Sequence, residues 1–121
     1  RRMQVSSVST LSHAMVGTGF PFKALELLPD YLGEFDRVLR TASGVRRGGS
    51  AALDLAYLAQ GSLDAFWEKT LMPWDFAAGI ALVQEAGGVL TRPDGSRLDF
   101  TTGPVVGANT AALLEKLRSL L

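Results

Sequence analysis

Residues 73–88 read PWDFAAGIALVQEAGG. Asp75 stands where a loop turns into a helix, and the small and apolar residues behind it can pack that helix tightly against a sheet. Gly87 and Gly88 end the segment, so the pattern predicts a helix over 76–86. A carboxylate at such a tip has two uses in proteins: Asp75 either caps the helix or holds a cation there.

Strands and helices alternate outward from this segment. Apolar and β-branched runs predict strands over 15–18, 44–47, 63–68, 89–91 and 105–107. Apolar residues at helical spacing predict helices over 30–42, 51–60 and 110–121, the first with an irregular lead-in near Pro29. Within 63–68 we expect Ala65 and Trp67 on one face and Phe66 and Glu68 on the other. The alternation favours an α/β fold, with helices on both faces of a mixed or mostly parallel sheet.

Composition limits the function classes. The chain has 121 residues, 47% of them hydrophobic, which fits a single α/β domain over 1–121. Basic and acidic residues balance at 12 each, so there is no overall basic field to gather nucleic acid or anionic lipid. The absence of cysteine and the single histidine exclude disulfides, thiol catalysis and multi-histidine or zinc–thiolate sites. Hard cations with oxygen ligands remain.

The chain carries no targeting signal that we recognise. No apolar run approaches the ~20 residues of a membrane-spanning helix, and the start RRMQ is not followed by the apolar stretch of a signal peptide. We therefore expect a soluble, cytoplasmic protein with no membrane partner. Because position 1 is not methionine, we also expect that the natural gene product starts elsewhere.

Two places along the chain could carry chemistry. The segment GGSAA (48–52) stands at a helix start, where free N–H groups and the helix dipole favour an anion or a ligand hydroxyl; Ser50 as a plain N-cap is the alternative. Glu68 and Asp75 flank a short loop, 69–74, that could bring both carboxylates to one rim of the sheet to hold Mg²⁺ or a polyol. The alternative makes Asp75 an N-cap and Glu68 a solvated strand end.

Four ordered blocks resemble the inositol monophosphatase family. They are RRGGSAALDLAY (46–57), DAFWE (64–68), WDFAAGIALVQEAGG (74–88) and VGAN (106–109), and GTGFPF (17–22) is similar to bacterial members. The resemblance implies an Mg²⁺-dependent, lithium-sensitive phosphatase of inositol, sugar or nucleotide phosphate monoesters, commonly a homodimer. It implies that Asp75 is the catalytic metal ligand and that Glu68 hydrogen-bonds substrate hydroxyls. Gly49, Ser50 and Ala51 would form the substrate-contacting helix start.

The resemblance covers only the C-terminal half of such enzymes. The family's N-terminal half carries a glutamate and an Asp-Pro-x-Asp-Gly-Thr block that supply the other metal ligands, and this block is missing here, where PDGS (93–96) is only a turn. We therefore expect that the missing N-terminal half is a partner and that this chain alone is inactive. The alternative function is a non-catalytic interaction or assembly domain that keeps the phosphatase fold.

The remaining polar residues have expected roles of their own. Arg46 and Arg47 could reach a phosphate or a neighbouring subunit, or could form an exposed strand-end pair. We expect Asp54 to be solvated or to fix a nearby loop, and His13 to lie on the surface. Trp67 and Met72 are expected to serve packing.

Overall fold

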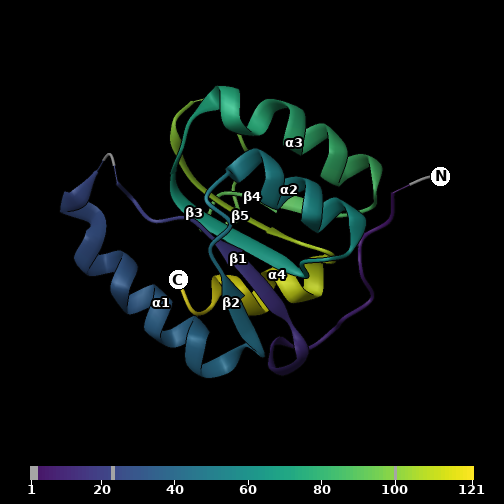
Figure 1. The fold of residues 1–121 in the computed structure, drawn as a ribbon, viewed down its shortest axis with the longest axis horizontal. Coiled ribbons are helices and arrows are strands. Elements are labelled where there is room, and N and C mark those ends of the chain that lie inside the picture. The colour runs from purple at the N-terminus through teal and green to yellow at the C-terminus, as the bar shows by residue number, and fades with distance from the viewer. Residues whose placement is uncertain (1–2, 23, 100) are drawn as a thin grey trace.

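One five-stranded mixed sheet organises the chain (Figure 1). The computed structural model describes residues 3–22, 24–99 and 101–121, with only the backbone described at positions 75 and 76. The strand order is β2-β1-β3-β5-β4, in which β1 runs parallel to β2 and β3, while β5 runs antiparallel to β3 and β4. The strands are β1 (Met15–Thr18), β2 (Gly44–Arg46), β3 (Ala65–Leu71), β4 (Val89–Thr91) and β5 (Gly103–Ala108).

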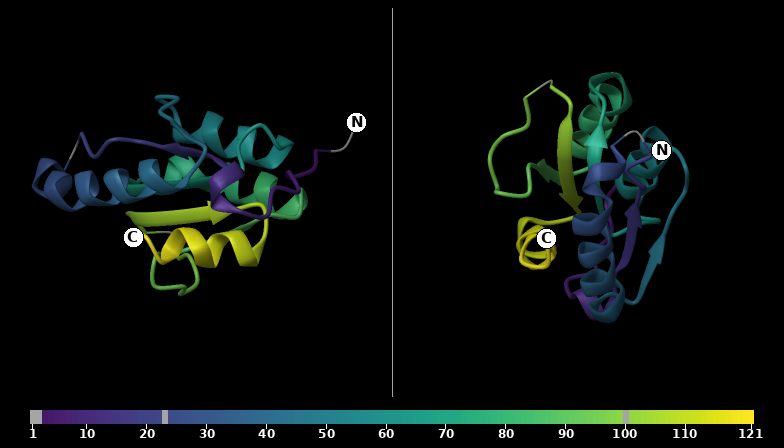
Figure 2. Two further views of the ribbon diagram at one scale, coloured as in Figure 1. Left: turned by 90° about the horizontal axis from the view of Figure 1, so that it is seen from below. Right: turned by 90° about the vertical axis from the view of Figure 1, so that its left-hand side faces the viewer.

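Helices cover both faces of the sheet, as predicted. They are α1 (Leu28–Thr41), α2 (Ala51–Gln60), α3 (Pro73–Glu85) and α4 (Ala111–Arg118), with short 3-10 turns η1 (Leu11–His13) and η2 (Leu25–Leu27). One core cluster joins α1 and α4 to the sheet and includes Tyr31, Val38, Trp67, Leu113 and Leu117. A second joins α2 and α3 to the other face and includes Leu55, Leu58, Phe66, Val83 and Val105. Figure 2 shows α2 and α4 on opposite sides of the strands.

The central strand β3 is longer than the sequence predicts. Trp67 and Phe66 point to opposite core clusters, which confirms the predicted alternation. However, the strand continues past Glu68 to Leu71, so the prediction of a loop over 69–74 is wrong. The register shifts here: Glu68 pairs with Val105 but Leu71 pairs with Gly103, so two residues of β3 face the single Pro104. Because proline has no N–H to donate, the ladder is interrupted and the strand bulges.

Capping residues set both ends of α2. The α2 bounds match the prediction, because Ser50 Oγ accepts a hydrogen bond from the N–H of Leu53 at 3.3 Å and Gly61 ends the helix in the left-handed region at φ 87°. In α1, Pro29 lies inside the first turn, where its missing N–H is harmless. The last helix, α4, ends at Arg118 rather than at 121.

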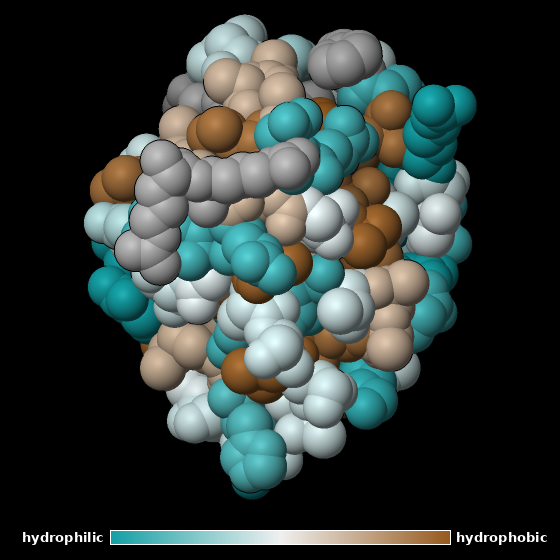
Figure 3. All heavy atoms as spheres, turned by 90° about the vertical axis from the view of Figure 1, so that its right-hand side faces the viewer, coloured by the Kyte–Doolittle hydropathy of each residue, from teal (hydrophilic) through white to brown (hydrophobic). Residues whose placement is uncertain are grey.

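The N-terminal segment is held at the edge of the sheet where β1 and β3 begin. Asn109 Nδ2 donates to the carbonyl oxygens of Ser6 and Val8 at 3.1 and 2.7 Å. Asp64 accepts from Ser6 Oγ at 2.5 Å and from the N–H of Met15 at 2.7 Å. On the face that carries this segment, apolar side chains emerge as separate patches between polar ones (Figure 3). Within the described residues, no helix is long and apolar enough to cross a membrane.

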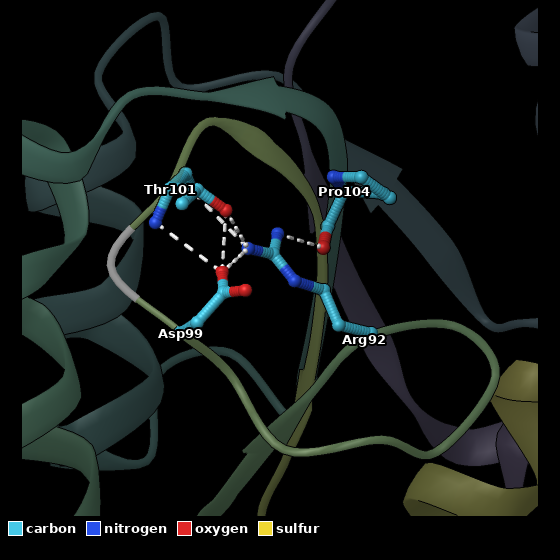
Figure 4. A network of polar contacts seen from close by, with 4 residues as sticks. All are labelled: Arg92, Asp99, Thr101 and Pro104. Carbon is cyan, nitrogen blue, oxygen red and sulfur yellow. Dashed lines mark hydrogen bonds and ion pairs between the residues drawn. The ribbon is translucent and has the colours of Figure 1, made fainter.

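Arg92 holds the loop between β4 and β5 (Figure 4). Its guanidinium donates to the carbonyl oxygens of Pro104 and Thr101 at 2.8 and 3.0 Å and to Asp99 Oδ1 at 2.6 Å. Hydrogen bonds from Thr101 and Arg92 lower the pKa of the Asp99 carboxyl to about 2, so this pair stays ionised at neutral pH. At the end of the loop, Thr102 Oγ1 lies 3.3 Å from Met72 Sδ, at the start of α3.

Arg92→Ala should loosen this loop. The amide exchange rates of Leu98, Thr101 and Thr102 are expected to rise about tenfold, because the loss of one charged hydrogen bond alone has that effect on local opening. Hydrogen exchange followed by NMR measures the change. Arg97→Ala, at an exposed position of the same loop, is the control and should leave these rates unchanged.

Candidate functional site

A hollow of about 300 Å³ lies where β1 and β3 end and α2 begins. It brings together Gly49, Ser50, Ala51 and Glu68, which the sequence analysis named as site residues. This is the carboxyl edge of the parallel strands, the edge at which α/β sheets bind ligands. The full lining is Phe20, Phe22, Gly49, Ser50, Ala51, Glu68, Thr70 and Met72.

The start of α2 presents donors to this hollow. Gly49 has a φ of 84°, in the left-handed region that favours glycine, and a side chain there would meet open space. Ser50 is the N-cap, which confirms the structural alternative for this residue. Its side chain satisfies only the N–H of Leu53, and helix geometry leaves the N–H groups of Ala51 and Ala52 without an intrahelical acceptor. These groups suit an anion or a ligand hydroxyl.

Glu68 reaches the hollow from the middle of β3. It is half-buried, and its carboxylate lies so close to Gly19 that a side chain at position 19 would overlap Glu68 Oε1. The absence of a side chain at Gly19 therefore leaves the room in which Glu68 sits. The alternative of a solvated strand end is wrong, because the strand continues beyond Glu68 and the residue lines a concave site.

Asp75 is the third residue of α3, and its side chain lies outside the described part of the structure. Met72 is the N-cap and Pro73 the first helical residue, so Asp75 is not the N-cap and the predicted start at 76 is wrong. Met72 lines the hollow, which places the start of α3 beside it. The pairing of Asp75 with Glu68 stays a prediction.

The described side chains do not make a metal site by themselves. Across residues 3–22, 24–74, 77–99 and 101–121, no three histidine or carboxylate side chains converge in a way that could hold a cation. Magnesium takes one or two protein carboxylates together with waters and substrate phosphate. The Glu68 carboxylate at the hollow fits one part of such a site. The metal-ligand role of Asp75 stays a prediction.

A smaller hollow of about 70 Å³ adjoins the first and contains a carboxylate with an unexpected position. Asp54 faces it together with Glu68, Arg47 and the Gly49–Ser50 turn. The residue is only 3% exposed and packs against Gly48, so the prediction of a solvated Asp54 is wrong and the loop-contacting alternative is correct. Asp54 shares the buried face of α2 with Leu58, four residues later, and this spacing is the signal that could have revealed it.

Burial raises the pKa of the Asp54 carboxyl from 3.8 to about 6, with the charge of Arg46 opposing the shift in part. The folded state therefore holds this proton more tightly than the unfolded state, so stability falls as pH rises from about 4 to about 6 and stays lower above that. Asp54→Asn should abolish this decline and raise the free energy of unfolding by roughly 2 kcal/mol at pH 7.5, with little change at pH 4. Urea unfolding of both proteins across this pH range measures the difference. A parallel decline in the variant would contradict the assignment.

Two aromatic residues that the sequence analysis did not single out form a wall of both hollows. Phe20 and Phe22 pack edge to face with ring centroids 5.8 Å apart, and the Arg47 guanidinium lies 4.8 and 4.9 Å from the two centroids. These contacts order an otherwise exposed arginine. The signal was their place in GFPF, directly after a buried strand and therefore at the carboxyl edge of the sheet.

Other residues match their expected structural roles. His13 is exposed in η1 and contacts Thr10 Oγ1 at 3.1 Å, away from the hollows. Trp67 is buried in the core, as predicted, whereas Met72 is only half-buried and lines the larger hollow. Arg46 is exposed at the end of β2, so a contact of either arginine with phosphate or with another subunit stays a prediction.

Comparison with known sequences adds an independent line of support. The model of the inositol monophosphatase family matches residues 1–121. The chain is 46% identical over 112 residues to a Nus factor SuhB of Pseudomonas aeruginosa, covering 91% of this chain and 41% of that protein. It is 42% identical over 109 residues to an inositol-1-monophosphatase of Synechocystis sp., covering 90% of this chain and 38% of that protein. The chain thus spans about two fifths of the length of these relatives.

Solved structures agree with this assignment. An inositol monophosphatase from Anabaena (Nostoc) sp. is 38% identical and superimposes with a TM-score of 0.92, covering 99% of this chain and 47% of that one. The extragenic suppressor protein suhB from Bartonella henselae is 41% identical with a TM-score of 0.91, covering 99% and 46%. The mixed sheet, the helices on its two faces and the match along the whole sequence lead to one conclusion: this chain belongs to the inositol monophosphatase family.

Proposed function

We propose that this chain supplies the alcohol-binding wall and one metal-binding carboxylate of a magnesium-dependent phosphomonoesterase. The substrate would be inositol-1-phosphate or a related sugar or nucleotide phosphate. One observation carries the proposal: the hollow joins the α2 start, with Gly49, Ser50 and Ala51, to Glu68 on β3. Donors on one side and a carboxylate acceptor on the other match a hydroxylated, anionic ligand.

Each part of the hollow has a distinct task in this proposal. The free N–H groups at the start of α2 donate to substrate oxygens, and Glu68 accepts a hydrogen bond from a hydroxyl of the alcohol. Phe20 and Phe22 cover the apolar face of the ring. Asp75 would hold Mg²⁺, which would supply Lewis-acid polarisation of the phosphoryl group and activation of a water for in-line attack.

The outer faces of α2 and α3 support a partner for this chain. Leu53, Trp74 and Leu82 are 47%, 73% and 39% exposed there, among exposed alanines at 52, 77, 78 and 81. Helices that are apolar on every side are typical of buried layers. More than half the length of the similar phosphatases lies outside this chain. In our proposal that part, the missing N-terminal half, covers this face, and the complete protein forms a homodimer.

Glu68→Gln in the complete protein tests the alcohol-binding role. The neutral amide makes a weaker hydrogen bond to a hydroxyl, so KM for inositol-1-phosphate should rise about tenfold, close to the worth of one charged hydrogen bond. The kcat for a simple aryl phosphate, which has no such hydroxyl, should change little. Steady-state kinetics with both esters measures the difference. Equal losses of activity with both esters would indicate that Glu68 is a metal ligand rather than a residue that binds the alcohol.

A second candidate is a non-catalytic role in assembly. One observation favours it: the similar Pseudomonas aeruginosa protein is named a Nus factor. Such a role needs the fold and an exposed contact surface but no metal. Magnesium-dependent turnover by the complete protein decides for the phosphatase. A folded complete protein that hydrolyses no inositol, sugar or nucleotide phosphate decides for assembly.

A further inference from the structure

Glu34 on α1 binds both side chains that flank Glu68 on β3. Its Oε1 accepts a hydrogen bond from Trp67 Nε1 at 3.1 Å, and its Oε2 accepts one from Lys69 Nζ at 2.7 Å. Trp67 and Lys69 alternate with Glu68 along the strand, so they lie on the face of the sheet opposite the candidate site. The same carboxylate therefore holds β3 from behind, on either side of the site residue.

The three partners are well shielded from water. Glu34 is 8% exposed, and the side chains of Lys69 and Glu34 in the ion pair are 18% and 10% exposed. Tyr31, one turn earlier on α1, stacks on the Trp67 ring with centroids 5.9 Å apart. Because a buried charge that loses its partner is unfavourable, the arrangement has one strongly preferred geometry.

The backbone at this place needs such support. Glu68 is the last residue of β3 in regular register with β5 before the bulge, and Pro104 opposite offers no N–H to the strand. The ladder therefore does not fix the backbone at positions 69 and 70, directly after the site residue. The Lys69 side chain is instead tied to α1, through the 2.7 Å bond from its Nζ to Glu34 Oε2. On the site face, the contact with Gly19 leaves Glu68 little room to adjust.

We infer that Glu34, through Trp67 and Lys69, is a positioning residue for Glu68 and thereby for recognition of the substrate alcohol. The inference rests on the proposed function for its catalytic consequence, although the coupling between the two glutamates does not depend on it. Disturbing Glu34 should tilt the strand at Glu68 and impair binding of hydroxylated substrates without removing any group from the site.

Kinetics of the complete protein test the consequence. Glu34→Gln keeps the shape and an acceptor for Trp67 but loses the charge that binds Lys69, and Lys69→Met removes the same ion pair from the other side. Each variant should lower kcat/KM for inositol-1-phosphate roughly tenfold, through a higher KM. Turnover of 4-nitrophenyl phosphate should change less than about twofold. The double variant should lose no more kcat/KM than either single variant. Asp36→Asn, which breaks the exposed Asp36–Arg40 pair on the same helix, is the matched control and should change neither. Equal losses with both esters, additive losses, or the same loss in the control would overturn the inference.

A second readout is independent of catalysis. In the complete protein, the ¹³C signal of the Glu68 carboxyl should shift in Glu34→Gln and Lys69→Met but not in Asp36→Asn. If the wild-type protein hydrolyses neither ester, the proposed function fails while this measurement still decides the positioning role. An unchanged Glu68 signal in both variants would overturn it, and Lys69→Met decides alone should Glu34→Gln fail to fold.

Discussion

Asp75→Asn in the complete protein is expected to lower kcat on the order of 10²–10³-fold, the loss that follows removal of one group that stabilises developing charge. The fold should hardly change. Met72 is the N-cap of α3 and Asp75 is the third helical residue, so the substitution leaves the N-cap in place and costs the helix only the ~0.3–1 kcal/mol of one first-turn charge. Asparagine keeps the size and a polar oxygen and removes only the anionic ligand for the cation.

Initial rates with inositol-1-phosphate at saturating Mg²⁺, together with thermal unfolding, measure both parts of this expectation. Asp94→Asn is the matched control, because Asp94 is an exposed carboxylate in the turn at 93–96. The control should retain wild-type rates. Near-normal Mg²⁺-dependent turnover in Asp75→Asn would show that Asp75 is not a metal ligand.

The 121-residue chain alone is expected to hydrolyse inositol monophosphate no faster than buffer, even with abundant Mg²⁺. The described residues contain no cluster of three histidine or carboxylate groups, and Asp75 with at most one neighbour cannot hold a small, strongly hydrated cation in octahedral geometry. The chain should also associate with itself through the exposed outer faces of α2 and α3.

Complementation extends this prediction. Adding the missing half in trans should restore Mg²⁺-dependent hydrolysis that Li⁺ inhibits, measured as phosphate release. The same half added to the chain that carries Asp75→Asn should restore nothing, which separates recovery of the site from mere stabilisation. Enzyme-like turnover by the isolated chain would show that it does not depend on a second half. It would also disprove that Asp75 with at most one neighbour cannot hold Mg²⁺.

The sequence predicted elements well where their limits are local. The α2 helix has a hydroxyl N-cap at Ser50 and a glycine at position 61, and both act within one turn of the chain. The mixed sheet with helices on both faces also followed from the alternation of patterns. The sequence did not predict the end of β3 at Leu71 or the start of α3 at Pro73. The strand β3 extends past Glu68 because it pairs with distant Gly103 across a bulge at Pro104.

The candidate site was found in part. Motif blocks indicated Gly49, Ser50, Ala51 and Glu68, and these four residues do line one hollow. The aromatic wall was missed. The place of Phe20 and Phe22 after a buried strand indicated the carboxyl edge of the sheet, but not that they line the same hollow as the start of α2. The contact of Asp54 with a loop was one of two predicted alternatives, and its spacing to Leu58 was the signal for its burial. The Glu34 contacts were missed, because they depend on which face of α1 meets the sheet.

The strand order has a consequence for how the protein folds. The central strand β3 lies between β1, near the start of the chain, and β5, near its end. Contacts between residues so far apart in sequence make folding slow, because the loop must close before the pairing stabilises it. During synthesis, β3 must wait as an open edge until β5 has emerged, and an exposed edge strand invites pairing with other chains. A ribosome that stalls before β5 would therefore release an aggregation-prone intermediate rather than a smaller folded protein.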